Sequence, residues 1–334
     1  MANKTRKSKP SYNIGIDLGG TKILTAVVDD KGKVVAAIKQ LTQAQEGAEA
    51  VIARIKQTMD KAIAKAKLTK KNIAGIGIGV PGVIDAKRGV IVKITNIPGM
   101  ERVPMAKILC EWLGHAAPVV LSNDVRVATW GEYLHGAGKG YKHLVTVWVG
   151  TGIGGGIILD GKLWEGSRGN AGEIGHMITL ADGPLALGAG IRGGIEALAS
   201  RTSIERDLRR ALTDGRASVL PKLLKNEGNA MKSGVLASAV GKKDELTIET
   251  LERAAHYLGL HAASLINCLD PELIIYGGGL MEKLGDWMVT RIAKTAKQHA
   301  INKANLDKIR LTPSALGDYA GVVGAAMLAR AEYA

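Results

Sequence analysis

The chain has no Phe, and only 4% of its 334 residues are aromatic. Proteins that bind single-stranded nucleic acids stack bases on aromatic side chains, so this composition argues against that class. Cysteine is also scarce. Cys110 and Cys268 lack a CxxC partner and a His at metal-ligand spacing. We interpret both as buried free thiols in a reducing compartment, and we expect a cytoplasmic protein.

Long hydrophobic runs are missing as well. Hydrophobic residues make up 46% of the chain, yet no apolar stretch approaches the roughly 18 to 20 residues that a membrane span needs. The first eleven residues are rich in Lys and Arg and lack the apolar region of a secretory signal. We interpret residues 1–11 as a basic flexible tail and expect a soluble protein without a membrane partner.

The charge balance is strongly positive, with a formal net charge of +14. Such a balance suits anionic ligands such as nucleotides, and it is equally compatible with nonspecific nucleic-acid affinity. Charge does not separate these cases. The scarcity of aromatic residues is what lowers the nucleic-acid interpretation, and we expect no specific nucleic-acid partner. The length of 334 residues is too great for one typical compact domain and suits two.

Hydrophobic periodicity indicates a mixed α/β chain with a repeated opening. Residues 12–17 and 23–28 predict two strands joined by a tight glycine turn, and the spacing of apolar residues over 48–68 predicts an amphipathic helix. Residues 144–149 and 157–159 repeat the strand pair around Gly150 to Gly156. Further predicted strands cover 75–80, 118–122 and 273–276, and predicted helices lie within 201–245, 251–269 and 320–334.

The repetition predicts two α/β domains. The first comprises residues 12–124 plus 320–334, since the C-terminal helix is expected to cross back onto it, and the second comprises residues 125–319. A strand followed by Gly277, Gly278 and Gly279 is expected to meet a ligand, because glycine turns after strands let a ligand approach the backbone closely.

Glycine turns with successive backbone N–H groups form anion-binding nests. Gly19 and Gly20 fit this description, as do the glycines from Gly150 onward. Beside the first turn, Asp17 can hold Mg²⁺ directly or through water, Thr21 offers a hydroxyl and Lys22 a positive charge for phosphate. The alternative is that these turns are simple hairpin connections. Neither a GxxxxGK[ST] motif nor a helix-opening dinucleotide fingerprint is present.

Eight motifs in order resemble the ROK family of sugar kinases and repressors, within the sugar kinase, Hsp70 and actin superfamily. They are Asp17-Leu18-Gly19-Gly20-Thr21-Lys22, Val80-Pro81-Gly82, Asn96-Ile97-Pro98-Gly99, Asn123-Asp124, Gly150 to Gly156, Gly172-Glu173-Ile174-Gly175-His176-Met177, Gly277-Gly278-Gly279 and Ser314-Ala315-Leu316-Gly317-Asp318. The resemblance covers nearly the whole chain.

The resemblance implies two ribonuclease-H-like (actin-like ATPase) domains with an active-site cleft between them, and ATP and Mg²⁺ as cofactors. It implies that Asp124 is the base that takes the proton from a hexose hydroxyl. The implied sugar-binding residues are Gly82, Asn96, Asn123, Glu173, His176 and Glu196. The implied nucleotide-binding residues are Asp17, Gly19, Gly20, Thr21, Lys22, Gly150, Thr151, Gly152, Gly277, Gly278 and Gly279.

Structural alternatives exist for three of these residues. Asp124 would serve as a helix N-cap after the strand 118–122, His176 as a satisfied structural histidine, and Glu196 as a charge at a helix N-terminus. The chemistry favours the functional roles, because phosphoryl transfer needs a carboxylate within hydrogen-bond reach of the nucleophile.

One stretch departs from the family. Most members carry zinc on a His and three cysteines in a CxCGxxGCxE stretch, where this chain has Leu187, Ala189 and Gly194 instead of cysteine. One neutral imidazole does not make a tetrahedral zinc site, so we expect no zinc. His176 is then available to a sugar or a carbonyl, and apolar packing or glycine-permitted backbone contacts must replace the metal.

Three alternative functions remain after the resemblance. A sugar-sensing repressor needs a helix-turn-helix domain of roughly 60 residues, and only eleven residues precede the first strand here. A sugar-binding pseudokinase is opposed by the intact Asp17 and Asp124.

Polyphosphate is an alternative donor to ATP, and the sequence does not choose among glucose, fructose, mannose, allose and N-acetylated amino sugars. A homodimer is expected by analogy with the family.

Overall fold

The computed structural model describes residues 11–114, 116–186, 190–225 and 227–331, which form two compact units. The first unit contains the residues up to Gly136 and the segment from Asp318 onward, and the second contains Ala137–Gly317. The helix that follows Asn123 belongs to the first unit by its contacts. The domain boundary at Asp124 stays a prediction, and the basic tail lies outside the described residues except for Ser11.

The first unit is built on a five-stranded sheet of order β3-β2-β1-β4-β8, with a small sheet β5-β6-β7 beside it. β1, β4 and β8 run parallel, whereas β2 and β3 are antiparallel to their neighbours. The elements are β1 (Tyr12–Leu18), β2 (Lys22–Val28), β3 (Val34–Leu41), α1 (Gly47–Lys65), β4 (Ile73–Val80), β5 (Val83–Asp85), β6 (Val90–Lys93), β7 (Glu101–Val103), α2 (Met105–Leu113), β8 (Val119–Asn123), α3 (Asp124–His135) and α10 (Ala320–Ala331).

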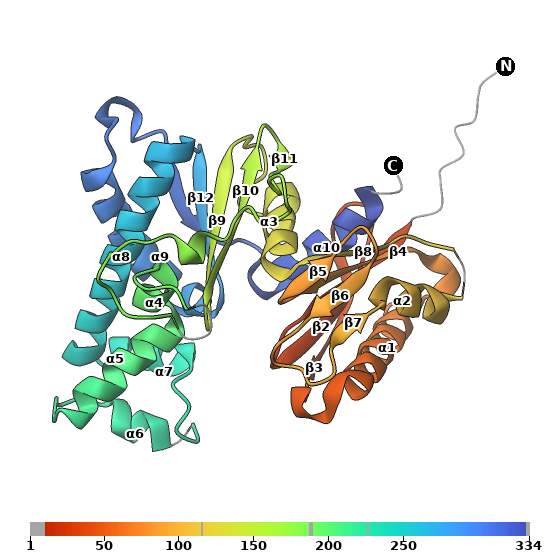
Figure 1. Ribbon diagram of the computed structural model, residues 1–334, viewed down its shortest axis with the longest axis horizontal. Helices are drawn as coiled ribbons and strands as arrows, with labels where there is room; N and C mark the ends of the chain where they lie inside the picture. Colours follow the sequence, from red (N-terminus) through yellow and green to blue (C-terminus); the bar gives the residue numbers. More distant parts are fainter. Residues whose placement is uncertain (1–10, 115, 187–189, 226, 332–334) are drawn as a thin grey trace. The chain divides into compact units, whose positions relative to one another are not determined.

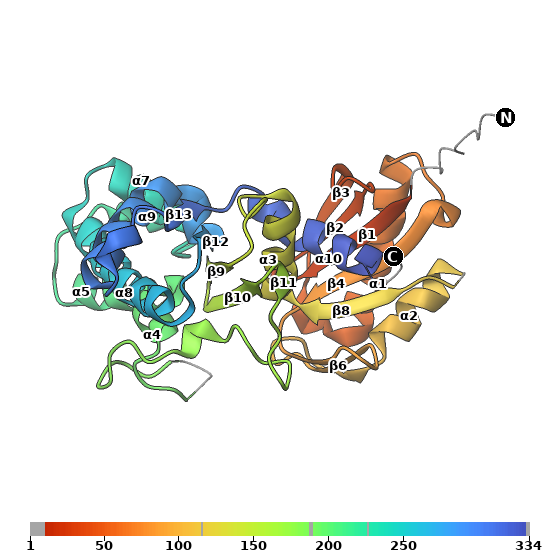
Figure 2. The same ribbon diagram turned by 90° about the horizontal axis from the view of Figure 1, so that it is seen from above.

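The two faces of this sheet differ because Gly and Ile alternate along the central strands. Ile76 and Ile78 of β4 belong to the apolar core that α1 and α2 complete (Figure 1). On the other face, a Cβ at Gly77 would collide with the backbone of Ala325 in α10. The glycine face therefore lets α10 approach the strands closely (Figure 2), and α10 groups with the first unit by its contacts. The predicted domain bounds that include this helix stay a prediction.

The second unit repeats this topology in a sheet of order β11-β10-β9-β12-β13. β9, β12 and β13 run parallel, and β10 and β11 are antiparallel. Its elements are β9 (Leu144–Val149), β10 (Ile153–Leu159), β11 (Lys162–Leu163), the 3₁₀ turn η3 (Ile174–His176), α4 (Ile195–Ala199), α5 (Arg201–Thr213), α6 (Leu220–Lys225), α7 (Ser233–Gly241), α8 (Glu245–Leu269), β12 (Leu273–Gly277), α9 (Gly279–His299) and β13 (Arg310–Pro313). Two copies of one strand order confirm the predicted duplication.

Alternation also fixes the core of the second unit. Val145, Val147 and Val149 point to one face of β9, where they pack with buried residues of α8 and α9. α8 is long and capped by Asp244, whose carboxylate accepts the amide of Thr247 at 3.1 Å. The strands predicted over 144–149 and 273–276 and the helix predicted over 251–269 are confirmed as β9, β12 and α8.

Two sequence-based expectations are wrong in detail. Gly154, Gly155 and Gly156 lie inside β10 and pair with β9, so the second glycine turn is only Gly150 to Gly152. Cys268 is exposed rather than buried, and Cys110 is partly buried. Neither cysteine forms a disulfide among the described residues.

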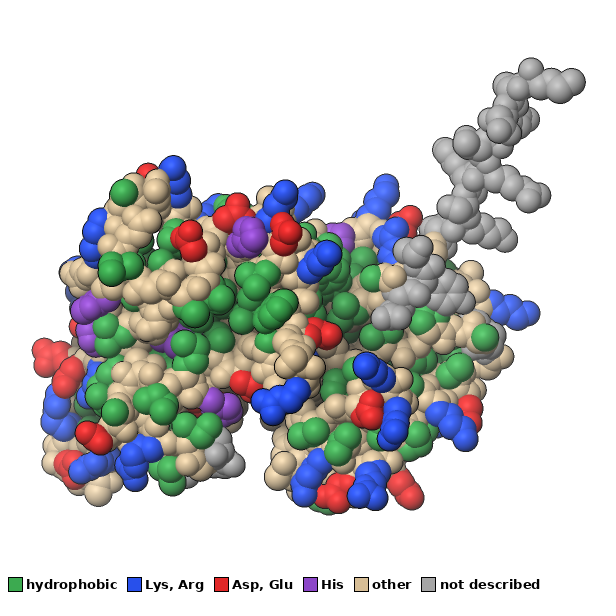
Figure 3. Space-filling view, turned by 45° about the horizontal axis from the view of Figure 1, so that its top comes forward, with side chains coloured by type: hydrophobic (Ala, Val, Ile, Leu, Met, Phe, Trp, Pro, Cys, Tyr) green, Lys and Arg blue, Asp and Glu red, His purple; other side chains and the backbone are tan. Residues whose placement is uncertain are grey.

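The surface carries mixed charge. On the face in Figure 3, Lys and Arg side chains are interspersed with Asp and Glu over both units. Within the described residues, every helix is too short or too polar to cross a bilayer.

Candidate active site

The carboxyl ends of three parallel strands form one edge of the first sheet. Asp17 lies near the end of β1 opposite Gly79 of β4, and Asn123 ends β8 opposite Val80. Open α/β sheets bind ligands beyond the carboxyl ends of their strands. The residues predicted to hold metal and to catalyse in the first unit therefore share the edge where ligands are expected.

Asp17 and Asp124 form an electrostatically coupled carboxylate pair at this edge. Burial, followed by the negative charges of Asp124 and Asp318, raises the pKa of Asp17 to about 7, with Lys22 opposing part of the rise. Gly321 of α10 faces the Asp17 carboxyl, where a side chain would come within 3.2 Å of it. Carboxylate oxygens are the ligands that a hard divalent cation such as Mg²⁺ prefers.

Asn123 rather than Asp124 caps α3. The side-chain oxygen of Asn123 accepts the amides of Val125 at 3.0 Å and Arg126 at 3.3 Å. Asp124 is the first residue of the helix, and its Oδ1 accepts the Val125 amide at 2.9 Å. The capping role is therefore filled by a neighbour, and this favours a functional role for the Asp124 carboxylate.

The first glycine turn is closed by a hydrogen bond from the Gly19 amide to the Lys22 carbonyl at 2.9 Å. Lys22 Nζ lies 2.6 Å from Asp318 Oδ1, and Lys39 Nζ lies 2.9 Å from Asp318 Oδ2. Burial alone would raise the pKa of Asp318, but the two lysines outweigh it and lower the pKa to about 2. Asp318 thus stays ionised and holds Lys22 beside the turn.

One predicted sugar contact, Asn96, lies against this turn. A Cβ at Gly20 would collide with the side-chain amide of Asn96, so the turn and Asn96 are in contact. Gly82 has a φ of +99°, and a side chain there would meet the carbonyl of Lys93. Thr21 is exposed at the same turn.

The second glycine turn follows β9 at the equivalent edge of the second sheet. The Gly150 amide donates to the Gly152 carbonyl at 2.9 Å. Glu196 of α4 reaches the end of this turn, where its Oε2 accepts the Ile153 amide at 2.8 Å. A Cβ at Gly152 would collide with the Glu196 carboxylate. The structure therefore brings Glu196 to the turn, and the role of a mere helix-terminal charge does not describe it.

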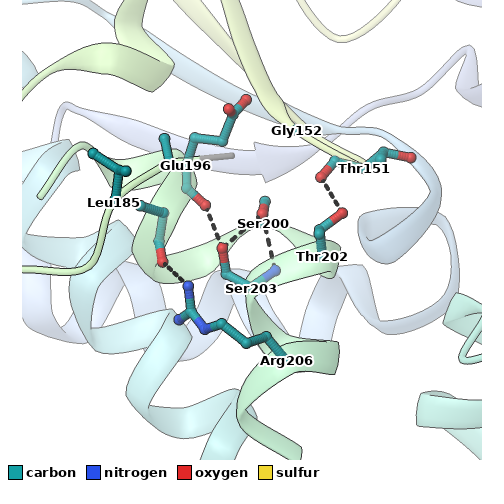
Figure 4. Close-up of a pocket in the computed structure, with 10 residues that line it drawn as sticks. Thr151, Gly152, Leu185, Glu196, Ser200, Thr202, Ser203 and Arg206 are labelled. Atoms are coloured by element: carbon teal, nitrogen blue, oxygen red, sulfur yellow. Dashed lines mark hydrogen bonds between the residues drawn. The ribbon is translucent and has the colours of Figure 1, made fainter. Parts of the chain in front are cut away.

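A cavity of about 280 Å³ adjoins Glu196 and the turn. Figure 4 shows it between α4, the start of α5 and Leu185. Two of its hydroxyls donate within the protein, Thr202 to the Thr151 carbonyl at 2.7 Å and Ser203 to the Glu196 carbonyl at 2.7 Å. The first bond ties the turn to α5, and the second ties α5 to α4.

Glu173 directly precedes the η3 turn and His176 is its last residue, and the turn packs tightly against β10. A Cβ at Gly175 would collide with the Ile153 carbonyl. From α8, His261 Nε2 lies 3.2 Å from the carbonyl of Ile174. Glu173 is exposed, whereas His176 Nδ1 is buried and has no hydrogen-bond partner among the described residues. The description of His176 as a satisfied structural histidine is therefore not supported.

The third glycine cluster joins β12 to α9. Gly277 ends β12 opposite Trp148, whose ring occupies the space that a Gly277 side chain would need. Gly278 has a φ of +88° and lies close to Val149, and Gly279 begins α9. Because β9 and β12 are parallel neighbours, this cluster and the second glycine turn lie at the same edge of the second sheet.

The family model described as ROK family matches residues 13–332. The chain belongs to the ROK family. It is 32% identical to the glucokinase of Halalkalibacterium halodurans, over 96% of this chain and 95% of that protein.

Two solved ROK structures have the same fold as this chain. A ROK family glucokinase from Streptomyces griseus in complex with glucose and AMPPNP is 31% identical, with a TM-score of 0.81 over 96% of this chain and 100% of that one. The ROK hexokinase of Thermus thermophilus is 31% identical, with a TM-score of 0.78 over 96% and 99%. The predicted class, two ribonuclease-H-like α/β domains, is confirmed, and the cleft between them stays a prediction.

In this ROK chain, backbone hydrogen bonds hold the segment that corresponds to the family's zinc motif. Thr179 and Leu180 donate to the Gly193 carbonyl at 2.8 and 3.2 Å, and Ile195 donates to the Met177 carbonyl at 3.1 Å. A Cβ at Gly193 would collide with the carbonyl of Leu180. Leu187 and Ala189 lie outside the described residues. The residues present do not fit zinc, since none of the three positions expected to hold thiolates is cysteine.

Three residues beside these predicted sites were missed by the sequence analysis. Asp318 belongs to a quoted motif but had no role. Arg201, whose guanidinium donates to the Thr151 hydroxyl at 3.1 Å, and His261 lie on helices without a recognisable motif. The only sequence signal for Arg201 was its positive charge at the start of a helix, directly before Thr202.

Proposed function

We propose that this chain is an ATP-dependent hexose kinase of the glucokinase type, which transfers the γ-phosphate of ATP to a sugar hydroxyl. Similarity over nearly the whole chain to a glucokinase, and to a ROK glucokinase crystallised with glucose and AMPPNP, supports the proposal. The observation that carries it is the coupled pair Asp17 and Asp124 at the ligand-binding edge of the first sheet.

Asp124 acts as the general base in this proposal. A carboxylate accepts the proton of the attacking hydroxyl as the bond to phosphorus forms, and such a base contributes typically 10² to 10⁴-fold to the rate. Asp124 is held at the first position of α3, directly after the β8 strand. Rigid placement on a strand–helix junction suits this role, because the base must stay within hydrogen-bond reach of the nucleophile.

The donor phosphates are proposed to contact the glycine turns. Gly19, Gly20, Thr21 and Lys22 would bind them from the first unit, and Gly150, Thr151 and Gly152 from the second. Gly277, Gly278 and Gly279 would contact the adenosine. Mg²⁺ held by Asp17, directly or through water, would neutralise charge on the phosphates. The ionised Asp318 keeps Lys22 oriented at the turn.

The sugar hydroxyls are proposed to bind Asn96, Asn123, Glu173, His176 and Glu196, with Gly82 providing room for the backbone to approach. With its oxygen engaged as a helix cap, the Asn123 amide nitrogen is the donor that remains for a ligand. Glu196 has one oxygen on the Ile153 amide, and the other is the acceptor we assign to the sugar. A homodimer stays a prediction from the family, and a cytoplasmic location stays a prediction from the low cysteine content.

The proposal is tested by measuring ADP formation with Mg·ATP against glucose, fructose, mannose, allose and N-acetylated amino sugars. Turnover with at least one hexose is expected, and it should survive zinc chelation once Mg²⁺ is restored. Polyphosphate in place of ATP gives the donor control, and ATP is expected to support the faster rate. Sugar binding without any turnover would instead identify a sugar-binding pseudokinase and contradict the proposal.

A further inference from the structure

The second glycine turn is anchored to the first two residues of α5. The amide of Arg201 donates to the Gly150 carbonyl at 2.9 Å, and the hydroxyl of Thr202 donates to the Thr151 carbonyl at 2.7 Å. In a trans peptide the C=O of one residue and the N–H of the next point in opposite directions. Holding both carbonyls toward α5 therefore directs the amides of Thr151 and Gly152 away from α5, where they can receive an anion.

The Arg201 side chain determines how the Thr151 hydroxyl bonds. Arg201 Nη2 lies 3.1 Å from Thr151 Oγ1. A guanidinium only donates hydrogen bonds, so the hydroxyl oxygen is the acceptor in this contact. The hydroxyl hydrogen is then left to donate, and it has no other partner among the described residues. A phosphate oxygen in front of the turn is the acceptor that this geometry provides for.

The positive charge of Arg201 is only partly neutralised. Arg201 Nη1 lies 3.4 Å from Glu205 Oε2 and 3.2 Å from the Met231 carbonyl. Glu205 is engaged more closely by Arg209, at 2.7 Å from Nη2 and 2.8 Å from Nε. Two arginines share one carboxylate, so net positive charge remains beside the turn. Charge of this sign favours the anionic end of a phosphate donor.

We infer that Arg201 is a positioning residue for the phosphate donor: it fixes the Thr151 hydroxyl as a donor and supplies the cation of the second glycine turn. The ligand class is the phosphate chain of a nucleoside triphosphate bound with its divalent cation. This inference rests on the proposed kinase function and adds a residue to its donor site.

Arg201→Met removes the charge and the donors while keeping the apolar stem. It is expected to raise the KM for ATP about tenfold or more, because one hydrogen bond to a charged group is worth about that factor, and to change the KM for the sugar less than about twofold. Arg201→Lys, which keeps the charge, should recover part of the loss. Titration with Mg·ADP in a calorimeter, without sugar, should show the same order of affinities.

Arg209→Met is the matched control. Like Arg201, Arg209 lies on α5 and pairs with Glu205. It donates to the carbonyl of Asn229, in the loop that also contains Met231, at 2.7 Å, but it does not touch the second glycine turn. This variant is expected to keep both KM values within about twofold of wild type. An equal rise in the KM for ATP in both arginine variants would reduce Arg201 to a general charge or stability effect and overturn the inference.

Thr151→Val tests whether Arg201 acts through the hydroxyl. In that background Arg201→Met should add less than about a twofold change, because coupled residues are not additive. A full tenfold effect of Arg201→Met in the valine background would contradict the inference. If the wild-type enzyme phosphorylates no sugar, the kinase proposal fails, and the Mg·ADP titrations still decide the role of Arg201 separately.

Discussion

At the scale of single residues, His261 is a buried base whose only hydrogen-bond partner among the described residues is the Ile174 carbonyl. Because a carbonyl only accepts, Nε2 carries the hydrogen and Nδ1 is unprotonated. Burial lowers the pKa of His261 to about 4, and the bond to Ile174 offsets part of this drop. The imidazole is therefore neutral at pH 7 and holds the η3 turn, which follows Glu173 and ends at His176.

Stability should fall in acid because of this residue. The unfolded chain binds a proton near pH 6.5 and the folded one only near pH 4, so the unfolded state gains protons first as pH drops. Between pH 7.5 and pH 5 this costs about 2 kcal/mol of unfolding free energy. In urea unfolding, the His261→Leu variant should lose that part of the pH dependence. The control variant His256→Gln, which changes an exposed histidine on the same helix, should keep it. Equal pH dependence in wild type and His261→Leu would refute the assignment.

The residues that the sequence predicted are those at strand ends. Asp17 and Asn123 follow apolar strands directly, so a pattern of alternation places them at a sheet edge. His261 and Arg201 could not be found in this way, because their partners are a carbonyl 87 positions away and a hydroxyl 50 positions away. Only the folded chain brings these pairs together.

At the scale of elements, glycines let main chain pack directly against main chain around η3. Gly175 permits contact with the Ile153 carbonyl, and a Cβ at Gly194 would lie 3.1 Å from the carbonyl of Gly175. Backbone contact of this kind is short and leaves no room for repacking. The element that bears Glu173 and His176 is therefore held by close packing of main chain against main chain.

Gly175→Ala should displace η3 from β10, since the added Cβ meets a backbone oxygen rather than a flexible side chain. We expect a loss of about 1 to 3 kcal/mol of stability and a rise in the KM for the sugar that exceeds the rise in the KM for ATP, measured by urea unfolding and steady-state kinetics.

Gly234→Ala provides the control for this change. Gly234 lies in α7 with no atom within 4 Å of an added Cβ. Alanine there should leave both KM values unchanged and stabilise the helix by up to about 1 kcal/mol. Wild-type sugar affinity in Gly175→Ala would show that η3 does not set the sugar site.

Composition alone misled the element assignment at one point. The composition of the run from Gly150 to Gly156 predicts one long turn, but in the structure Gly154 and Gly156 pair with Trp148 and Thr146 of β9. Glycine is permissive enough to extend as well as to turn. Only the pairing partner on the neighbouring strand distinguishes the two conformations.

At the scale of the whole molecule, the duplication was predictable because two strand–glycine–strand segments are visible in the sequence. Both units show the same strand order, with three antiparallel strands and two parallel additions. The packing of α3 and α10 in the first unit was less accessible, because it depends on glycine contacts such as Gly324 against the Val127 carbonyl. The helical periodicity of the sequence does not indicate how closely α3 and α10 pack.

The central claim is that Asp124 is the base of a hexose kinase, and the most direct test compares wild type with Asp124→Asn on the best hexose. Asparagine keeps the shape at the start of α3 and removes the proton acceptor. We predict a fall in kcat of about 10² to 10⁴-fold, with sugar and Mg·nucleotide still bound in calorimetry. A variant that kept more than a tenth of the wild-type kcat would contradict the account.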